Sequence, residues 1–111
     1  MLLATIAAVA ALASGVSGRA VIDPAFPVCT VGTPCSAPDR HEVIVFWRGT
    51  RQAATATTGV DGSFRVPLPP GLYTITLPRR NGARVTMTPA QLRVPRGRFV
   101  RVVLRVDVGI R

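Results

Sequence analysis

The sequence predicts an all-β protein, a β-sandwich or partly closed barrel, preceded by an N-terminal signal helix. Short runs that alternate apolar and polar residues recur along the chain, and turn residues separate them at close spacing. No window after residue 20 keeps the apolar repeat of a helix. With 111 residues the chain is long enough for one domain with a small core.

The alternation is clearest in TGVDGSFRVPLPPGLYTITL, residues 58–77. Phe64 and Tyr73 lie on the apolar sides of two successive runs, so both are expected in the core. Between the runs, the two prolines of residues 69–71 cannot donate to a ladder and the glycine permits a reversal, which predicts a structural corner rather than a binding loop. Upstream, Asp61-Gly62 is typical of a tight hairpin turn.

Seven or eight short strands are expected in all. They cover residues 19–22, 42–47, 52–57, 63–67, 71–77, a weaker pair at 84–88 and 91–94, and 98–107. The last strand has the most regular pattern, because valines and a leucine alternate with Arg101 and Arg105. The period of two places these two arginines on one outward face.

The N-terminal residues 2–13 contain a single polar residue. This length is typical of the apolar part of a signal peptide and too short to span a membrane. We expect a signal peptide over residues 1–20 and a single exported domain over 21–111, with a retained apolar helix as the alternative. The expected location is secreted or in the cell envelope, either extracellular or periplasmic. Small residues allow cleavage after Ala13, Gly18 or Ala20.

Cys29 and Cys35 are the only cysteines. In a short exported chain they predict one local disulfide bond, since a redox pair is more often spaced Cys-x-x-Cys. Zinc is the alternative, but Cys29, Cys35 and His41 are one ligand short of four unless Asp39 or Glu42 joins them. We therefore expect no metal.

The formal net charge is +9, and all fourteen basic residues are arginines. The absence of lysine indicates a GC-rich genome, and an aromatic content of 5% is low for a nucleic-acid stacking platform. Arginine clusters nevertheless bind anions. The candidate anion-binding residues are Arg93, Arg96, Arg98, Arg101 and Arg105; the alternative is a solvated face that discourages edge pairing. Strand order decides whether they form one patch.

The turn and corner resemble the central signature of the carboxypeptidase regulatory-like domains, the transthyretin-like or prealbumin-like sandwiches of many exported bacterial proteins. Gly59 departs from it, because a more typical member has Asp there. The resemblance implies a seven-stranded Greek-key sandwich with a structural or binding role and no catalytic residues. The matching residues are Thr57, Gly62, Phe64, Val66, Leu68, Pro70, Gly71, Tyr73 and Ile75.

Three functions follow for comparison. The first is an exported, non-catalytic module that binds a cell-envelope component, a glycan or another anionic partner. The second is a purely structural or accessory protein without a small ligand. The third, a transthyretin-like hydrolase, is disfavoured because the chain has one histidine and residues 107–111 lack the tyrosine-containing tetrapeptide of that enzyme. The expected partner is an anionic envelope polymer, a glycan or an unidentified protein. We expect no enzyme activity, no cofactor, no nucleic-acid partner, and membrane contact only during export.

Overall fold

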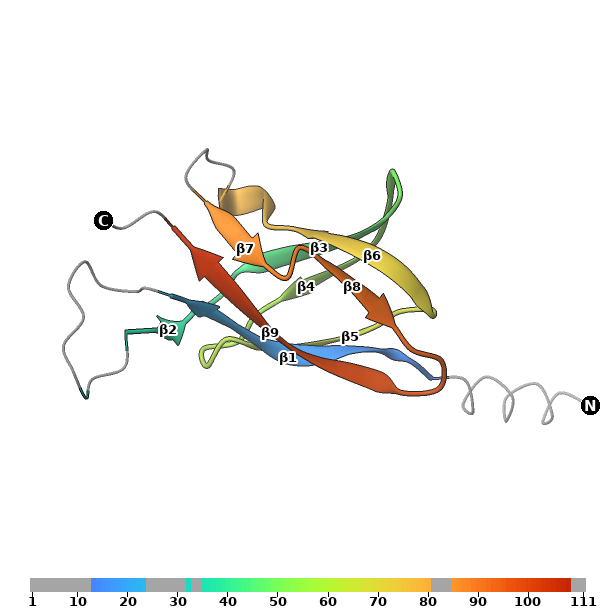
Figure 1. The fold of residues 1–111 in the computed structure, drawn as a ribbon, viewed down its shortest axis with the longest axis horizontal. Coiled ribbons are helices and arrows are strands. Elements are labelled where there is room, and N and C mark those ends of the chain that lie inside the picture. The colour runs from blue at the N-terminus through green and yellow to red at the C-terminus, as the bar shows by residue number, and fades with distance from the viewer. Residues whose placement is uncertain (1–12, 24–31, 33–34, 81–84, 109–111) are drawn as a thin grey trace, which may run out of the picture.

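The computed structural model describes residues 13–23, 32, 35–80 and 85–108. These residues form nine β-strands and one short 3-10 helix, arranged in two layers (Figure 1). The elements are β1 (Gly15–Ile22), β2 (Ala37–Pro38), β3 (Val43–Arg48), β4 (Arg51–Thr57), β5 (Ser63–Pro67), β6 (Gly71–Thr76), η1 (Pro78–Arg80), β7 (Thr86–Thr88), β8 (Gln91–Val94) and β9 (Phe99–Asp107).

The strands form two sheets, here named A and B. In sheet A the order is β2-β1-β9-β7. Both β5 and β2 pair with the edge of β1 that faces away from β9: β5 pairs with the first part of β1, and β2 pairs with its last two residues. In sheet B the order is β4-β3-β6-β8. β1 runs parallel to β9, and the other pairs of described strands are antiparallel. β1 is therefore a central strand of sheet A.

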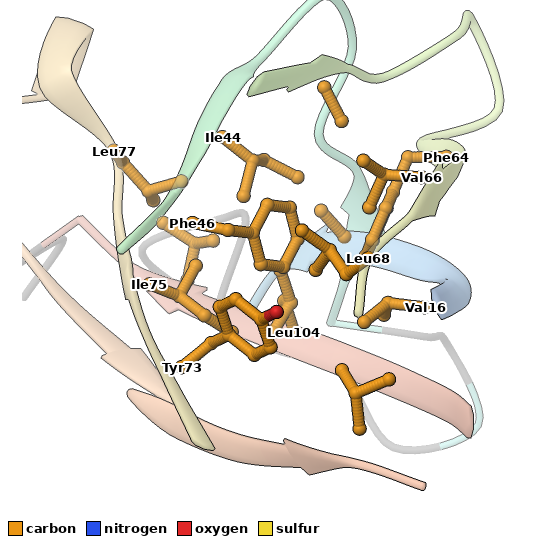
Figure 2. Packing of buried hydrophobic residues seen from close by; sticks show 14 residues of the cluster. Val16, Ile44, Phe46, Phe64, Val66, Leu68, Tyr73, Ile75, Leu77 and Leu104 are labelled. Atoms are coloured by element: carbon orange, nitrogen blue, oxygen red, sulfur yellow. The ribbon is translucent and has the colours of Figure 1, made fainter. Parts of the chain in front are cut away.

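The core lies between the two sheets, where their apolar faces meet (Figure 2). Phe46 and Tyr73 from sheet B face Phe64 and Leu104 from sheet A, and the rings of Phe46 and Phe64 are 6.3 Å apart. Complete burial of one large apolar side chain contributes about 1.5–3 kcal/mol, so these contacts dominate the stability of the fold.

The two-sheet, all-β architecture agrees with the sequence-based prediction. All the predicted strands are present close to their expected positions, although β1 is longer than expected. The described residues form nine strands rather than seven, partly because β2 has only two residues and no alternation to reveal it. The N-terminal signal helix is not a feature of the described residues, and residues 1–12 lie outside them.

The predicted domain boundary at residue 20 falls inside β1, and the site of signal-peptide cleavage stays a prediction. Val16 and Ala20 are fully buried, and the hydroxyl and carbonyl of Ser14 exchange hydrogen bonds with the backbone of Leu68. The sandwich therefore includes residues 15–20, which are needed to complete sheet A. Among the described residues, no helix is long and apolar enough to cross a membrane.

Residues 69–71 form a corner that carries the chain from β5 in sheet A to β6 in sheet B. The Tyr73 hydroxyl donates a 2.6 Å hydrogen bond to the carbonyl oxygen of Pro69, which ties the corner to the next strand. Phe64 and Tyr73 are 7% and 1% exposed, so their predicted core positions are confirmed. They belong to consecutive strands on opposing sheets.

The predicted hairpin at Asp61-Gly62 is wrong, because β4 before it and β5 after it belong to different sheets. A type I′ hairpin turn needs a positive φ at both central residues. Gly62 has a φ of +81°, but Asp61 does not have a positive φ, because His41 is the only described non-glycine residue that does. The Asp61 carboxylate instead accepts hydrogen bonds from the amide and hydroxyl of Ser63. The turn is a connection between sheets, and β5 consequently lies against β1.

Candidate anion-binding surface

The candidate anion-binding surface lies on the outer face of sheet A, where β1 runs between β5 and β9. Residues that alternate with the buried ones on these strands point away from the core. Ser17 of β1 pairs with Arg65 of β5 on one side and with Arg101 of β9 on the other. The two arginines therefore flank one serine in a row across three strands.

Arg19 extends this arrangement along β1, two residues beyond Ser17 on the same face. Neighbouring strands lie about 4.8 Å apart, so the backbones at Arg65 and Arg101 are about 10 Å apart across β1. All three arginine side chains are exposed. We call Arg19, Arg65, Arg101 and the central Ser17 the sheet A arginine cluster.

A shallow groove of about 480 Å³ lies within the cluster. Arg19 and Arg101 line it together with Val103, which is 49% exposed. The remaining lining residues are Ser17, Gly18, Ser63 and Val102. The groove thus combines two cationic side chains with hydroxyl groups and a small apolar surface.

Arg65 is held in place by Phe99. Its guanidinium carbon lies 3.7 Å from the centre of the Phe99 ring, a cation–π contact that crosses β1. The crossing depends on Gly15: a Cβ there would lie 2.6 Å from Cε2 of Phe99 and 2.3 Å from the carbonyl oxygen of Val66. Glycine at this position lets the ring lie over the backbone of β1.

The five arginines proposed from the sequence do not form one row. Arg101 and Arg105 share the outer face of β9, as the alternation predicts, but Arg93 lies on β8 in sheet B. Arg96 and Arg98 are in the connection between β8 and β9.

Arg105 also differs from Arg101 in its partners. Its guanidinium lies 3.2 Å from Oδ2 of Asp23, which neutralises part of its charge. No ion pair of Arg19, Arg65 or Arg101 occurs within the described part of the chain. Arg19 and Arg65 were missed as site residues because only the pairing of β1 with β5 and β9 brings them to Arg101.

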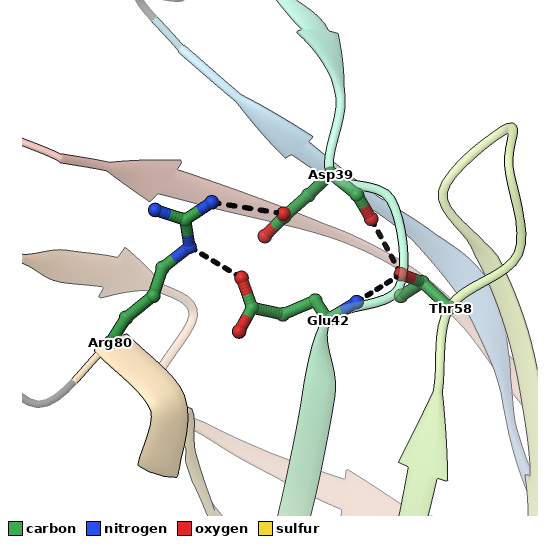
Figure 3. Close-up of polar contacts among 4 residues, drawn as sticks. All are labelled: Asp39, Glu42, Thr58 and Arg80. Carbon is green, nitrogen blue, oxygen red and sulfur yellow. Dashed lines mark hydrogen bonds and ion pairs between the residues drawn. The ribbon is translucent and has the colours of Figure 1, made fainter.

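A second polar cluster is buried at another place in the molecule (Figure 3). Arg80 of η1 contacts Asp39 at 3.3 Å and donates a hydrogen bond through Nε to Glu42. Thr58 donates to the carbonyl oxygen of Asp39 and accepts from the amide of Glu42 at 2.8 Å. These contacts fasten the start of β3 to η1 and to the end of β4.

The pKa of Asp39 is raised from 3.8 to about 7. Burial is the largest cause, the neighbouring Glu42 carboxylate adds to it, and Arg80 offsets part of the effect. Oδ2 of Asp39 is buried without a hydrogen-bond partner among the described residues. Asp39 and Glu42 thus act as a pair of carboxylates beside one cation, which favours a proton on Asp39 near neutral pH.

The structure gives no further support to the zinc alternative. Within the described ranges, no group of three or more His, Cys, Asp and Glu residues is placed to hold a metal ion. Asp39 and Glu42 are instead engaged with Arg80. Cys29 lies outside the described residues, so the Cys29–Cys35 disulfide bond stays a prediction.

The sheets and their shared core define the class of the protein as a β-sandwich. No protein-family model and no curated protein matches the chain. Among solved structures, the fold is similar to the minor pilin of the Gram-positive pathogen Streptococcus agalactiae, with a TM-score of 0.57 and 11% sequence identity. The match covers 86% of this chain and 44% of that chain, so the likeness is one of fold to part of a longer protein.

Proposed function

We propose that this chain is an exported, non-catalytic β-sandwich module that binds anionic polymers of the cell envelope through the sheet A arginine cluster. One observation carries the proposal: Arg19, Arg65 and Arg101 share the outer face of sheet A and none of them forms an ion pair in the described structure, with only a longer-range attraction between Arg19 and the Asp61 carboxylate. Such a concentration of positive charge attracts acidic polymers. The groove beside Ser17 supplies hydroxyl groups for shorter-range contacts.

The proposal also includes a specific family for the β-sandwich. We place the sandwich with the carboxypeptidase regulatory-like, prealbumin-like modules, which are mostly structural or binding domains. The residues of the resembling motif support this, since Phe64, Val66, Tyr73 and Ile75 are all buried. The fold likeness to a bacterial surface pilin is compatible with a location in the cell envelope.

Retention on a heparin column tests the binding. The triple variant Arg19→Gln/Arg65→Gln/Arg101→Gln should elute at much lower salt than the parent. The control Arg93→Gln/Arg96→Gln/Arg98→Gln loses the same charge outside the cluster and should shift less. Retention of the parent should weaken with ionic strength, because the screening length falls to about 10 Å at 0.1 M salt.

Two outcomes would contradict the proposal. Equal shifts for the two triple variants would assign the retention to net charge alone. Elution of the sheet A variant with the parent would favour the second function, a purely structural or accessory protein. Thermal melts that match the parent would show that each variant is folded, which is expected because the substituted side chains are exposed.

The export part of the proposal has its own test. Cleavage after Ala13 leaves β1 whole, whereas cleavage after Gly18 or Ala20 removes buried Val16 from sheet A. We therefore expect the mature chain to begin at Ser14. Intact-mass measurement of exported protein checks this, and a mass that corresponds to a start at residue 19 or 21, or to retained Met1, would contradict it.

A further inference from the structure

The contact between Arg65 and Phe99 does more than place a charge on sheet A. A guanidinium that lies flat against a ring keeps its N–H groups in a plane parallel to the ring. At 3.7 Å from the ring centre, one face of the group is covered by Phe99, and its edge stays available for hydrogen bonds. The stack fixes the direction of the donors before any ligand arrives, which reduces the ordering that binding requires.

The surroundings of Arg65 determine what these donors can bind. The Arg65 guanidinium lies over Phe99, two residues before Arg101 on the same face of β9, and Ser17 of β1 pairs with Arg101, so a bound group meets the edge of one guanidinium, a second cation and a hydroxyl that come from three strands. A planar carboxylate presents two oxygens in one plane, which a single arginine fork already satisfies. A tetrahedral oxyanion presents oxygens in several directions and suits donors that converge from different strands.

We propose that Arg65, stacked on Phe99, is the specificity-determining residue of a site for tetrahedral oxyanions formed with Ser17 and Arg101. The ligand class is a polymer that carries phosphodiester or sulfate ester groups. This inference rests on the proposed function and deepens it, because it assigns the discrimination between anions to an oriented guanidinium. Charge alone would not discriminate between arginine and lysine at residue 65.

The test uses substitutions that keep the charge. Arg65→Lys retains one positive charge but loses the planar fork and the ring stack. Its affinity for immobilised heparin, which carries sulfate esters, or teichoic acid, which carries phosphodiesters, should fall about tenfold, the effect of losing one charge-assisted hydrogen bond. Arg51→Lys on β4 of sheet B is the matched control and should bind like the parent.

Phe99→Leu provides a second variant, because it removes the ring and leaves all arginines in place. It should weaken binding in the same direction as Arg65→Lys. If Phe99→Leu lowers stability, Arg65→Lys still decides the matter, since Arg65 is exposed. The heparin and teichoic acid arms identify which ester the site prefers, and a polygalacturonate column supplies a carboxylate polymer for comparison.

The outcomes separate this inference from the function on which it rests. If Arg65→Gln weakens retention but Arg65→Lys binds like the parent, the surface binds anions by charge alone and the oriented site is wrong. Retention on polygalacturonate equal to that on both ester polymers would also overturn the preference for tetrahedral groups. If the triple glutamine variant also elutes with the parent, the proposed function fails as well.

Discussion

The chain uses arginine in two contrasting ways. Arg80 is paired with two buried carboxylates, Asp39 and Glu42, and its side chain is 32% exposed. Arg65 and Arg101 are exposed on the outer face of sheet A and have no carboxylate partner in the described structure. The charge of the first is used within the fold, and the charges of the others are available to a ligand.

This contrast shows how the roles of arginines in a strongly basic chain can be distinguished. A net charge of +9 does not distinguish arginines that stabilise the fold from arginines that face a partner. Burial and ion pairing do distinguish them, because a buried carboxylate must be compensated whereas a solvated arginine need not be. Substitutions in the two regions should therefore affect different properties: stability in one, anion binding in the other.

The largest expected effect is on stability, from Arg80→Gln. This change leaves Asp39 and Glu42 without their cation, and breaking a buried ion pair typically costs about 3–5 kcal/mol. Chemical denaturation should show a loss near the lower end of that range, because Arg80 is partly solvated. Arg79→Gln, one residue earlier and exposed, should stay within about 0.5 kcal/mol of the parent. Equal losses for both would contradict the assigned role of Arg80.

The next effect concerns pH. The pKa of Asp39 is raised in the folded state to about 7 from 3.8, so between those values the folded protein holds a proton that the unfolded chain releases. Stability contributed by this group is therefore fully present below about pH 4 and is lost as the pH rises through about 7. Melting temperatures across this range should fall for the parent more than for Asp39→Asn. Parallel curves would contradict the raised pKa.

A smaller effect is expected from the cysteines. Cys35 lies four residues before Asp39 in the sequence. Replacing both Cys29 and Cys35 by Ser should lower stability by about 2 kcal/mol through loss of a short covalent loop. Retention on heparin should not change. Thiol labelling of freshly isolated exported protein offers a direct check, and two labelled thiols would show that the disulfide is absent.

The smallest effect separates two arginines of one strand. Arg101→Gln should lower retention on heparin more than Arg105→Gln, because Arg105 already faces Asp23 at 3.2 Å. Neither change should alter stability by more than about 0.5 kcal/mol, since an exposed ion pair contributes little. A larger loss for Arg105→Gln would move the binding surface toward the β7 edge of sheet A.

The sequence predicts features that depend on local pattern. Alternation placed Phe64 and Tyr73 in the core and put Arg101 and Arg105 on one face, because the period of a strand is two. The corner at residues 69–71 followed from proline and glycine chemistry. The two-residue β2 carries no periodic signal, and the tight turn at residues 61–62 resembles a hairpin in sequence although it joins two sheets.

The candidate site depends on contacts between distant parts of the chain, which local pattern does not report. Arg19 meets Arg101 only because β1 runs parallel to β9, and Arg65 joins them only because β5 pairs with the other side of β1. In the same way Arg80 reaches Asp39 across 41 positions. From the sequence, we considered Asp39 and Glu42 only as additional zinc ligands, because no pattern near them in the sequence indicates that they pair with Arg80.

The most direct measurement is an NMR titration of the isotope-labelled domain with a short heparin oligosaccharide. Binding at the sheet A arginine cluster predicts the largest amide shift changes at Ser17, Arg65 and Arg101, with little change around buried Asp39. The changes should diminish as salt is added. Shift changes centred on residues 93–98, or no changes at low salt, would contradict the assignment of anion binding to the outer face of sheet A.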